Sequence, residues 1–494
     1  MWTVDFHCGE LMSTLFPERI PNWIAGRAEC SALFFDKRSP VNGAVICHVS
    51  RSQSDTVARA VESALQAQPA WAQTPAVKRG DMLFGLCDLL AANKQTMAKL
   101  VAAETGKSVK DAMGETDAAI ALGRFMAGEG QRLYGKTTTS AVAGRTVMTV
   151  RQPVGVAGLI IAANTPVANI AWKFFPALIC GNTVVVKAAE DTPLSAWFFG
   201  DCCSRVGIPA GAWQIVQGIG HEAGAALVDD SRVDLISFTG SSAVGRRIAA
   251  VAGERLARLS MELGGKNPLL VCDDADLEQA VRWSVLSAFS NAGQRCAAAS
   301  RIIVMPAVYD LFKEKFLSAT AKLKLGPDDG HDLGPVINAR QLQTMLMAVA
   351  AARDEGAVVL SGGQRAGGVL GKGFFMQPTV LENVSPQSAI SKTELFGPVV
   401  CLYKADDYEH ALELANDCPY GLTASIHTRS LQRSMLFTQR IKAGVASVNG
   451  GTHGSEPHMP FGGFKQSGNG SREPGSEALD VYTELKNIVI NINV

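Results

Sequence analysis

Segments typical of buried strands alternate with segments typical of helices through the middle of the chain. Such an alternation predicts a parallel sheet covered by helices on both faces, which is an α/β fold. A second alternation runs from about residue 268 to 449, so two such sheets are expected. The strands and helices expected in the first are, in chain order, Val154–Ala162, Val167–Ile179, Thr183–Lys187, Leu194–Val206, Leu235–Phe238 and Ser242–Ala252.

Two further segments read as strands that leave the body of the protein. Residues Arg132–Gln152 are rich in threonine and valine and contain Gly144 as a turn residue, which is typical of a hairpin. The tail Glu484–Ile492 has the pattern of another strand. We expect the hairpin and the tail to pair with a second subunit. The preceding region, residues 54–126, has mostly helical spacing of its Ala, Leu and Met residues.

The composition excludes several classes of protein. With 494 residues, 47% of them hydrophobic and 19% charged, the chain is long enough for two or three globular domains. The formal net charge is zero, so no overall field attracts nucleic acid or an anionic membrane, and neither is an expected partner. The eleven cysteines include no C-x-x-C pair, so we expect no metal site and a reducing compartment, the cytoplasm.

Neither a signal peptide nor a membrane span is expected. Residues Met1–Ile20 carry acidic side chains and no long apolar core, unlike a signal peptide. The uncharged run Pro153–Trp172 is interrupted by Asn164 and Pro166. We therefore interpret this run as a buried strand followed by a turn and a helix.

The usual dinucleotide fingerprint, G-x-G-x-x-G after a strand, is missing, although Gly218 and Gly220 supply two of its glycines. Instead, an expected strand ends at Gly240, and a helix begins at Ser241 or Ser242. The free N–H groups and positive dipole end of a helix N-terminus suit a pyrophosphate. The alternative is an ordinary serine-capped helix.

Lys187 and Glu190 follow another expected strand at its carboxyl end. A carboxylate there can accept hydrogen bonds from the ribose hydroxyls of a dinucleotide. It would also repel a 2′-phosphate, which favours NAD over NADP. The alternative is a lysine–glutamate pair on a solvated loop.

Three polar residues could carry covalent chemistry on an aldehyde. Cys296 follows the sequence Gly-Gln-Arg and precedes three alanines, which leave room for a substrate, and a helix terminus or a nearby cation lowers the pKa of such a thiol. Glu262 precedes two glycines and suits a general base with a raised pKa, or else it pairs with Arg258 or Lys266. Asn164 could donate to an oxyanion, or it is a turn asparagine before proline.

Four motifs occur in order along the chain: Met261–Lys266, Gly293–Cys296, Glu394–Pro398 and Pro460–Gly468. Together they resemble the aldehyde dehydrogenase superfamily of the hydrolytic, NAD(P)-dependent type. The resemblance extends from about Asn22 to the final strand. It implies two Rossmann-like parallel-sheet domains and a β-hairpin oligomerisation arm in a homodimer or homotetramer. The implied parts are an NAD-binding domain (1–131 and 152–262), a catalytic domain (263–465) and the arm (132–151 and 481–494).

The resemblance also implies catalytic roles at matching positions. Cys296 looks like the nucleophile, and Glu262 looks like the base that activates the deacylating water. Asn164 looks like the oxyanion donor, working with the backbone N–H of Cys296. Lys173 matches a family lysine near the catalytic centre.

A short turn after a strand replaces the usual fingerprint in this family's NAD site. Lys187 and Glu190 match the residues that bind the adenosine ribose, and Glu394 and Phe396 match the contacts to the nicotinamide ribose. The resemblance thus implies NAD as the cofactor, with NADP disfavoured by Glu190. The complete set of expected cofactor-binding residues is Lys187, Glu190, Gly220, Phe238, Gly240, Ser241, Gly245, Leu263, Glu394 and Phe396.

The chain departs from the family pattern where the substrate is expected. Thr165 stands where an aromatic residue commonly lines the substrate tunnel, so we expect a wider or more polar pocket. Ala188 replaces a proline after the cofactor lysine. Arg295 favours an anionic semialdehyde if it faces the substrate, and is structural if it points away. The expected substrate-lining residues are Thr165, Asn169, Trp172, Arg295, His453 and Phe461.

The expected function is NAD-dependent oxidation of a small aldehyde, either a semialdehyde or an aromatic aldehyde, to the carboxylic acid. The path runs through a thiohemiacetal and a thioester on Cys296. One alternative is a CoA-acylating semialdehyde dehydrogenase, although relatives of that type typically lack the glutamate that this chain has at Glu262. A catalytically silent NAD-binding relative is another alternative. A papain-like hydrolase is disfavoured because no histidine lies in the motifs.

Overall fold

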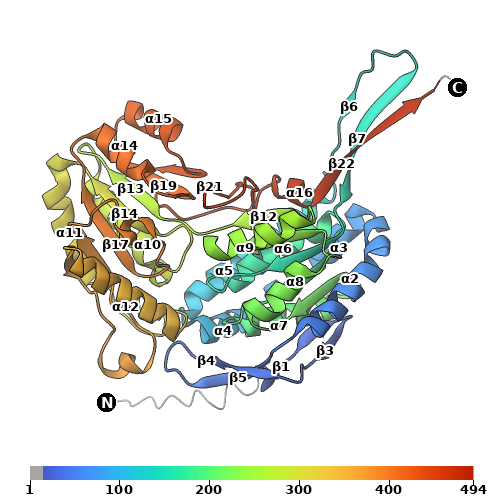
Figure 1. Ribbon diagram of the computed structural model, residues 1–494, viewed down its shortest axis with the longest axis horizontal. Helices are drawn as coiled ribbons and strands as arrows, with labels where there is room; N and C mark the ends of the chain where they lie inside the picture. The colour runs from blue at the N-terminus through green and yellow to red at the C-terminus, as the bar shows by residue number, and fades with distance from the viewer. Residues whose placement is uncertain (1–14, 493–494) are drawn as a thin grey trace.

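Two α/β bodies and a projecting arm make up the protein (Figure 1). The structure is a computed structural model that describes residues 15–492, so most of the segment Met1–Ile20 lies outside the described residues. No helix within residues 15–492 combines the length and the apolar character that a membrane crossing requires.

The first body is built on a seven-stranded sheet with the strand order β12-β11-β8-β9-β10-β2-β3. The five strands from β12 to β10 run parallel, whereas β2 and β3 pair antiparallel at one edge. The expected parallel sheet is therefore confirmed. Its strands are β2 (Asn22–Ile24), β3 (Arg27–Glu29), β8 (Val156–Ile160), β9 (Thr183–Lys187), β10 (Trp213–Val216), β11 (Leu235–Thr239) and β12 (Arg258–Glu262).

Helices cover both faces of this sheet because its strands are apolar on both sides. In β8, Ala157 and Leu159 pack in one core cluster, while Val156 and Ile160 pack in the other. Helices α3 to α7 contribute to the first cluster, and α2, α8 and α9 contribute to the second. These helices are α2 (Ser54–Gln73), α3 (Ala76–Ala92), α4 (Lys94–Thr105), α5 (Val109–Glu129), α6 (Pro166–Ile179), α7 (Pro193–Val206), α8 (Ala225–Asp229) and α9 (Ser242–Glu254).

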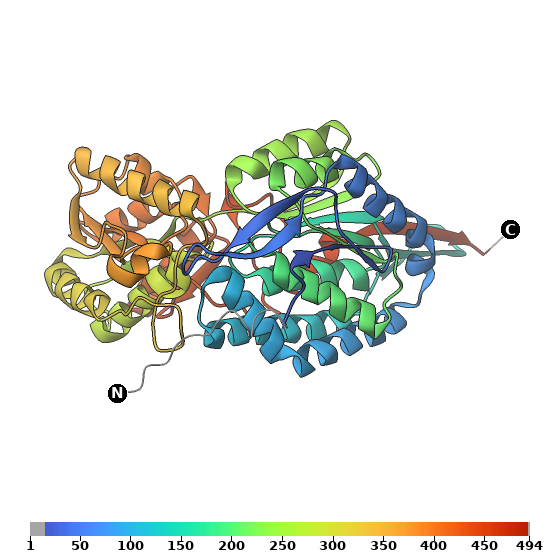
Figure 2. The ribbon, with the colours of Figure 1, turned by 90° about the horizontal axis from the view of Figure 1, so that it is seen from below.

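The second body has its own seven-stranded sheet, in the order β15-β16-β17-β14-β13-β19-β20. Only β15 runs antiparallel to its neighbour. The strands are β13 (Asn267–Val271), β14 (Ala299–Val304), β15 (Val358–Ser361), β16 (Thr379–Glu382), β17 (Val399–Lys404), β19 (Thr423–His427) and β20 (Val445–Val448). The helices are α10 (Leu277–Phe289), α11 (Tyr309–Ala321), α12 (Ala339–Asp354), α13 (Ala389–Lys392), α14 (Tyr408–Asn416) and α15 (Leu431–Arg440). Figure 2 shows this body beside the first.

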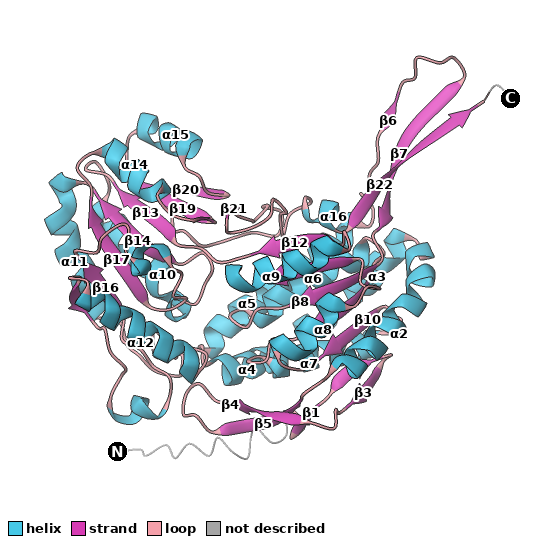
Figure 3. Ribbon diagram, in the orientation of Figure 1, coloured by secondary structure: helices cyan, strands magenta, loops and turns pink. Residues whose placement is uncertain are grey.

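The arm is a three-stranded antiparallel sheet in the order β22-β7-β6 (Figure 3). The expected hairpin supplies β6 (Thr137–Thr138) and β7 (Arg145–Pro153), and the expected tail supplies β22 (Thr483–Asn491). The register runs from Thr483 opposite Pro153 to Asn491 opposite Arg145. The hairpin and the tail thus pair with each other within one chain, which the sequence pattern had not indicated.

Other short elements link the two bodies. One small sheet has the order β1-β5-β4, and another pairs β18 with β21. After β21 the chain returns to the first body, where the Leu263 N–H donates to Ser467 O at 2.9 Å. The elements are β1 (Arg19–Ile20), β4 (Phe34–Arg38), β5 (Val45–Ser50), β18 (Tyr420–Gly421), β21 (Phe464–Lys465) and α16 (Ala478–Val481).

The expected elements of the first body differ from the structure mainly at their ends. Strand β8 is shorter than the predicted run Val154–Ala162, and α9 extends to Glu254 rather than Ala252. Strand β10 and helix α8 were not predicted. The first sheet ends at Glu262 and the second begins at Asn267, so only four residues, 263–266, separate the last strand of one from the first strand of the other.

Candidate active site

A turn of left-handed residues places Cys296 after helix α10. Asn291, Ala292 and Gly293 have φ angles of 54°, 52° and 67°, a conformation that costs energy in residues other than glycine. The side chain of Gln294 stabilises this turn, because its amide nitrogen donates to Asn291 O at 3.3 Å and to Pro335 O at 3.1 Å. The run of residues 291–294 before the cysteine therefore has a structural role, because it sets the position of the thiol.

Asn267, the first residue of β13, fixes the other side of the Cys296 loop. Its Nδ2 donates to Cys296 O at 2.7 Å and to Ala298 O at 2.9 Å. This residue was not predicted from the sequence, because an asparagine at a strand start carries no distinctive pattern. The peptide unit that follows the thiol is thereby held against the second sheet.

The thiol of Cys296 lies half-buried beside an aromatic wall. It packs in a small cluster with Trp172 and Phe461, whose rings meet edge to face at 5.3 Å. Its surroundings raise its pKa to about 12, first because the site is removed from water and then because Glu394 and Glu262 lie nearby. The expectation of a lowered pKa is wrong here: Arg295 does act downward, but more weakly than burial.

Glu262 ends strand β12, and its carboxylate is buried. Neither of its oxygens has a hydrogen-bond partner among the described residues. Burial raises the pKa of Glu262 well above its ordinary value of 4.5, and the nearby Glu473 raises it further, while Lys173 lowers it. The salt bridge considered with Arg258 or Lys266 does not form. This carboxyl group has the environment of a general base.

Lys173 lies in a fully buried cluster next to Glu262. Its Nζ donates to Glu473 at 2.8 Å and to Ser237 Oγ at 2.7 Å. The hydroxyls of Ser237 and Ser260 each donate to Glu473 at 2.7 Å. Glu473 was not predicted from the sequence, because its partners come from α6, β11 and β12 and are brought together only by the fold.

Asn164 lies between β8 and α6, and its side-chain amide donates to Gln294 O at 3.0 Å. The amide of Asn169 donates to Thr165 Oγ1 at 2.8 Å and to Thr165 O at 3.0 Å. Asn169 is buried, and its amide is used in hydrogen bonds within the turn, whereas Thr165 is partly exposed. Asn164 is thus held directly beside the cysteine loop.

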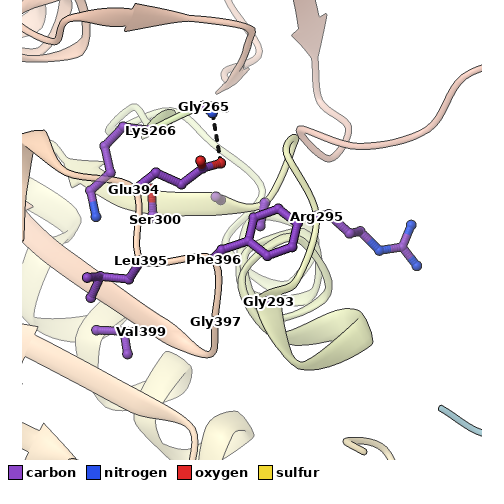
Figure 4. Close-up of a pocket in the computed structure, with 12 residues that line it drawn as sticks. Gly265, Lys266, Gly293, Arg295, Ser300, Glu394, Leu395, Phe396, Gly397 and Val399 are labelled. Carbon is purple, nitrogen blue, oxygen red and sulfur yellow. Dashed lines mark hydrogen bonds between the residues drawn. The ribbon is translucent and has the colours of Figure 1, made fainter. Parts of the chain in front are cut away.

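Arg295 points away from the pocket formed around Glu394 and Phe396 (Figure 4). Its Nε is buried without a partner within residues 15–492, and its guanidinium makes no ion pair with any described residue. Desolvation lowers the pKa of Arg295, while Asp111 and Glu115 act upward. His453, whose pKa is lowered to about 4 by burial and then by Arg295, lies on the same side. A neutral imidazole and an unpaired cation therefore lie together.

The pocket of Figure 4 depends on two glycines between the sheets. Glu394 accepts a hydrogen bond from the Gly265 N–H at 2.9 Å, and a Cβ at Gly264 would lie only 1.9 Å from the Glu394 carboxylate. Burial raises the pKa of Glu394 to about 7. Phe396 lines the same pocket with a left-handed φ of 56°. The absence of side chains at Gly264 and Gly265 leaves room for the Glu394 carboxylate.

The remaining cofactor candidates lie along the first sheet. Glu190 accepts the Gly220 N–H at 2.8 Å, and Lys187, at the end of β9, has its pKa lowered to about 8 by burial. Ser241 caps α9 by accepting the Val244 N–H at 3.4 Å, as the serine-capped alternative predicted.

Two close contacts explain the glycines after β11. A Cβ at Gly240 would lie 2.4 Å from the ring of Phe238, and one at Gly245 would lie 2.7 Å from Leu263. No Cβ atom therefore fills the space beside the backbone at the end of β11 and in the first turn of α9. In the described part of the chain, no group of three or more His, Cys, Asp or Glu side chains is arranged to hold a metal ion.

A half-buried thiol and a desolvated carboxyl group lie together at the edge of an α/β sheet, an arrangement that suits chemistry through a covalent cysteine adduct. The chain belongs to the aldehyde dehydrogenase family, whose model matches residues 27–488. It is therefore an enzyme of the aldehyde-oxidising class.

Individual proteins support this membership. The chain is 38% identical to the alpha-ketoglutaric semialdehyde dehydrogenase of Bacillus subtilis, over 90% of this chain and 92% of that protein. It is 36% identical to the 2,5-dioxopentanoate dehydrogenase of Saccharolobus solfataricus, over 94% and 97%. A structure of betaine aldehyde dehydrogenase from Staphylococcus aureus in complex with NAD+ matches with a TM-score of 0.95 at 31% identity, over 99% of this chain and 98% of that one.

Gly265→Ala should disable the site, because the added Cβ would lie 2.5 Å from Cys296 O and 2.6 Å from the Asn267 amide. We expect a drop in kcat of about 10²-fold, as for a misplacement of about 1 Å, measured by NADH formation. Gly253→Ala, where nothing lies within 4 Å, is the matched control and should keep full activity. Equal activity of the two variants would refute this view of the glycine pair.

Glu262→Gln should stabilise the protein while removing its turnover. The raised pKa means that the folded state binds the proton more tightly than the unfolded state, so the contribution of Glu262 to stability is fully present below about pH 4.5 and is lost as the pH rises through the folded pKa. The neutral amide escapes this loss. We expect its advantage, about 1–3 kcal/mol for an unsatisfied buried group, to be present at pH 8 and small at pH 5.

Thermal unfolding at the two pH values measures this difference. Glu355→Gln, at the exposed end of α12, is the control and should show no pH-dependent gain. A Glu262→Gln melting temperature equal to wild type at pH 8 would contradict the argument.

Proposed function

We propose that this enzyme oxidises a carboxylate-bearing aldehyde to the corresponding dicarboxylic acid with NAD as hydride acceptor. The observation that carries the proposal is the unpaired guanidinium of Arg295, which lies next to Cys296 in the chain and on the side away from the Glu394 pocket. Arg295 is partly buried, and a cation partly withdrawn from water without a carboxylate partner favours a ligand that supplies one. A substrate carboxylate would meet that need.

The residues present fit a dinucleotide. Glu190 offers a carboxylate at a strand end, Gly240 and Gly245 keep the turn before α9 open, and Glu394 lies behind the glycine pair for the second ribose. The chemistry that bound NAD supplies is hydride acceptance. The carboxylate of Glu190 disfavours a 2′-phosphate, and the NAD+ complex of the Staphylococcus aureus protein supports the same choice.

The covalent step begins at Cys296. Its proton must leave first, and Glu262 is a carboxyl group near the thiol with no hydrogen-bond partner among the described residues. The sulfur then bonds to the aldehyde carbon, and the carbonyl pair moves to oxygen. Asn164 Nδ2 and the Cys296 N–H stabilise that oxyanion, a donor of this kind being worth about 3–4 kcal/mol.

Hydrolysis completes the cycle. Glu262 first releases the thiol proton to solvent, and loss of hydride leaves a thioester on Cys296. A water oxygen then bonds to the carbonyl carbon of the thioester while a water proton passes to the ionised Glu262. The carbon–sulfur bond then breaks and releases the acid. Lys173 favours the ionised form of Glu262, because its charge lowers the pKa of that carboxyl group.

The pocket supports a polar rather than a purely apolar substrate. Thr165 adds a partly exposed hydroxyl, and His453 adds a neutral imidazole that can donate a hydrogen bond. Trp172 and Phe461 form the one aromatic wall beside the thiol among the described residues. The names of the relatives from Bacillus subtilis and Saccharolobus solfataricus, both dehydrogenases of oxo acids, agree with this choice.

Arg295→Met should separate anionic from neutral substrates. Loss of a charge-assisted hydrogen bond worth about 1.5–3 kcal/mol predicts a fall in kcat/KM of about 10- to 150-fold for succinic and glutaric semialdehydes. Butanal, pentanal and benzaldehyde should change little. NADH formation over this series is the measurement.

Two controls accompany the series. Arg353→Met, at an exposed site on α12, should leave all substrates unaffected, and Cys296→Ala should abolish turnover on all of them. If wild type prefers benzaldehyde and Arg295→Met loses nothing on the semialdehydes, the anionic substrate is refuted. Full turnover by Cys296→Ala would refute the covalent mechanism itself.

We also propose that the arm joins subunits into a homodimer or homotetramer. Strand β22 forms the edge of the arm sheet and exposes Leu485, Val489 and Ile490 by 65%, 47% and 46%. An exposed apolar strand edge is a template for pairing with another chain.

A reducing compartment such as the cytoplasm is supported by the free thiols of the described cysteines.

The double substitution Leu485→Lys with Val489→Lys should lower the molecular mass in solution, because two charges disfavour burial of the strand. Analytical ultracentrifugation measures the mass. Leu431→Lys, on α15 at 77% exposure, is the control and should leave the mass unchanged. A wild-type protein that sediments as a monomer would refute the proposal.

A further inference from the structure

A buried ion pair lies outside the groups so far given a chemical role. Lys107 Nζ donates to Glu115 at 2.7 Å, and both side chains are only 5% exposed. Burying two charges is costly, and such pairs persist where additional hydrogen bonds satisfy the remaining polar atoms. The other partners of this pair therefore show what it holds in place.

Lys107 makes its second bond to the main chain of Asn164. Its Nζ donates to Asn164 O at 2.8 Å, and this oxygen also accepts the side-chain amide of Asn291 at 3.4 Å. Asn291 belongs to the left-handed turn before Cys296. Lys107 thus fixes the main chain of Asn164, whose side-chain amide donates to the loop before Cys296.

Glu115 makes its second set of bonds to the first turn of α6. Its other oxygen accepts the Val167 N–H at 2.9 Å and the Ala168 N–H at 3.4 Å. The N-cap residue of α6, Thr165, makes no side-chain capping bond, so the glutamate of α5 serves instead. A carboxylate is favourable at a helix N-terminus. Asn164 is therefore held at its own carbonyl and through the helix that follows it.

The turn that carries Lys107 also contacts the second body. Gly106 ends α4 with a left-handed φ of 75°, and a Cβ there would lie 2.3 Å from Pro335. The carbonyl of Pro335 accepts the Gln294 side chain, which stabilises the Cys296 loop. One short turn therefore contacts the supports of both Asn164 and Cys296.

We propose that Lys107 and Glu115 are positioning residues that set the Asn164 amide for oxyanion stabilisation. The inference rests on the role proposed above for Asn164. Neither charged side chain needs to touch the substrate: the lysine fixes the peptide of Asn164, and the glutamate fixes the start of α6. Displacement of the donor by about 1 Å is enough to slow the chemical step about 10²-fold.

The test removes the pair as a unit, because loss of one partner leaves an uncompensated buried charge. The full-length double variant Lys107→Met with Glu115→Gln is compared with Asn164→Ala and with the triple variant. The readout is the single-turnover rate of NADH formation with saturating succinic semialdehyde and NAD. We expect the double variant to be about 10²-fold slower and the triple variant to be no slower than Asn164→Ala alone.

Two measurements separate positioning from general damage. NAD affinity, measured by quenching of tryptophan fluorescence, should stay within about 2-fold of wild type, because the hydrogen bonds of the pair go to Asn164 and the start of α6 and to none of the expected cofactor residues. Glu115→Gln alone keeps an acceptor for the Val167 N–H but leaves the buried Lys107 charge without a carboxylate, so it should slow the reaction at least as much as the double variant. Lys313→Met with Glu382→Gln removes a second ion pair of 2.8 Å, on α11 and β16, and should leave the rate unchanged.

The outcomes distinguish the pair from the oxyanion donor. A double variant and a Glu115→Gln variant that both keep the wild-type rate would overturn the positioning role and leave Asn164 untouched. A triple variant slower than Asn164→Ala by the full factor of the double variant would show that the pair acts by another route. An Asn164→Ala variant with the wild-type rate would overturn the proposed oxyanion donor, and the inference with it.

Discussion

The close approach of backbone and side chains at Gly264 and Gly265 is the constraint on which the site depends. These glycines lie in the four-residue link, 263–266, between the last strand of one sheet and the first strand of the other. A methyl group at Gly264 would strike the Glu394 carboxylate, and one at Gly265 would strike the Cys296 carbonyl. Glu262, the Cys296 loop and the Glu394 pocket can lie close together because Gly264 and Gly265 have no side chains.

Removal from water dominates the electrostatics of the same region. It is the largest cause of the raised pKa values of Glu262, Cys296 and Glu394, and it outweighs the neighbouring cations Lys173 and Arg295. The site without ligands therefore favours neutral acids over ions.

Local patterns in the sequence predicted the first sheet well. Strand β9 was placed at Thr183–Lys187 because a run of valines buried on both faces has few other solutions. The motifs around Cys296 and Glu262 also identified the family. The pairing of β22 with β7 was missed, since it joins residues far apart in the chain, and neighbouring residues carry no record of it.

Several features of the site also depend on packing that local sequence patterns do not show. The sign of the pKa shift at Cys296 was predicted wrongly, because a nearby arginine is visible in the sequence whereas loss of water arises only from packing. Lys107, Glu115 and Glu473 were overlooked, since single charged residues in helices and loops usually face solvent. The direction of Arg295 was left open by the sequence, and the structure turns it away from the Glu394 pocket.

The return of the chain after β21 links the arm to the buried cluster around Lys173. Glu473, which neutralises Lys173 in the buried cluster, and β22, which forms the edge of the arm, belong to one short C-terminal segment joined by α16. The strand at the edge of the arm and the residue that balances charge beside Glu262 are therefore separated by only a short stretch of chain.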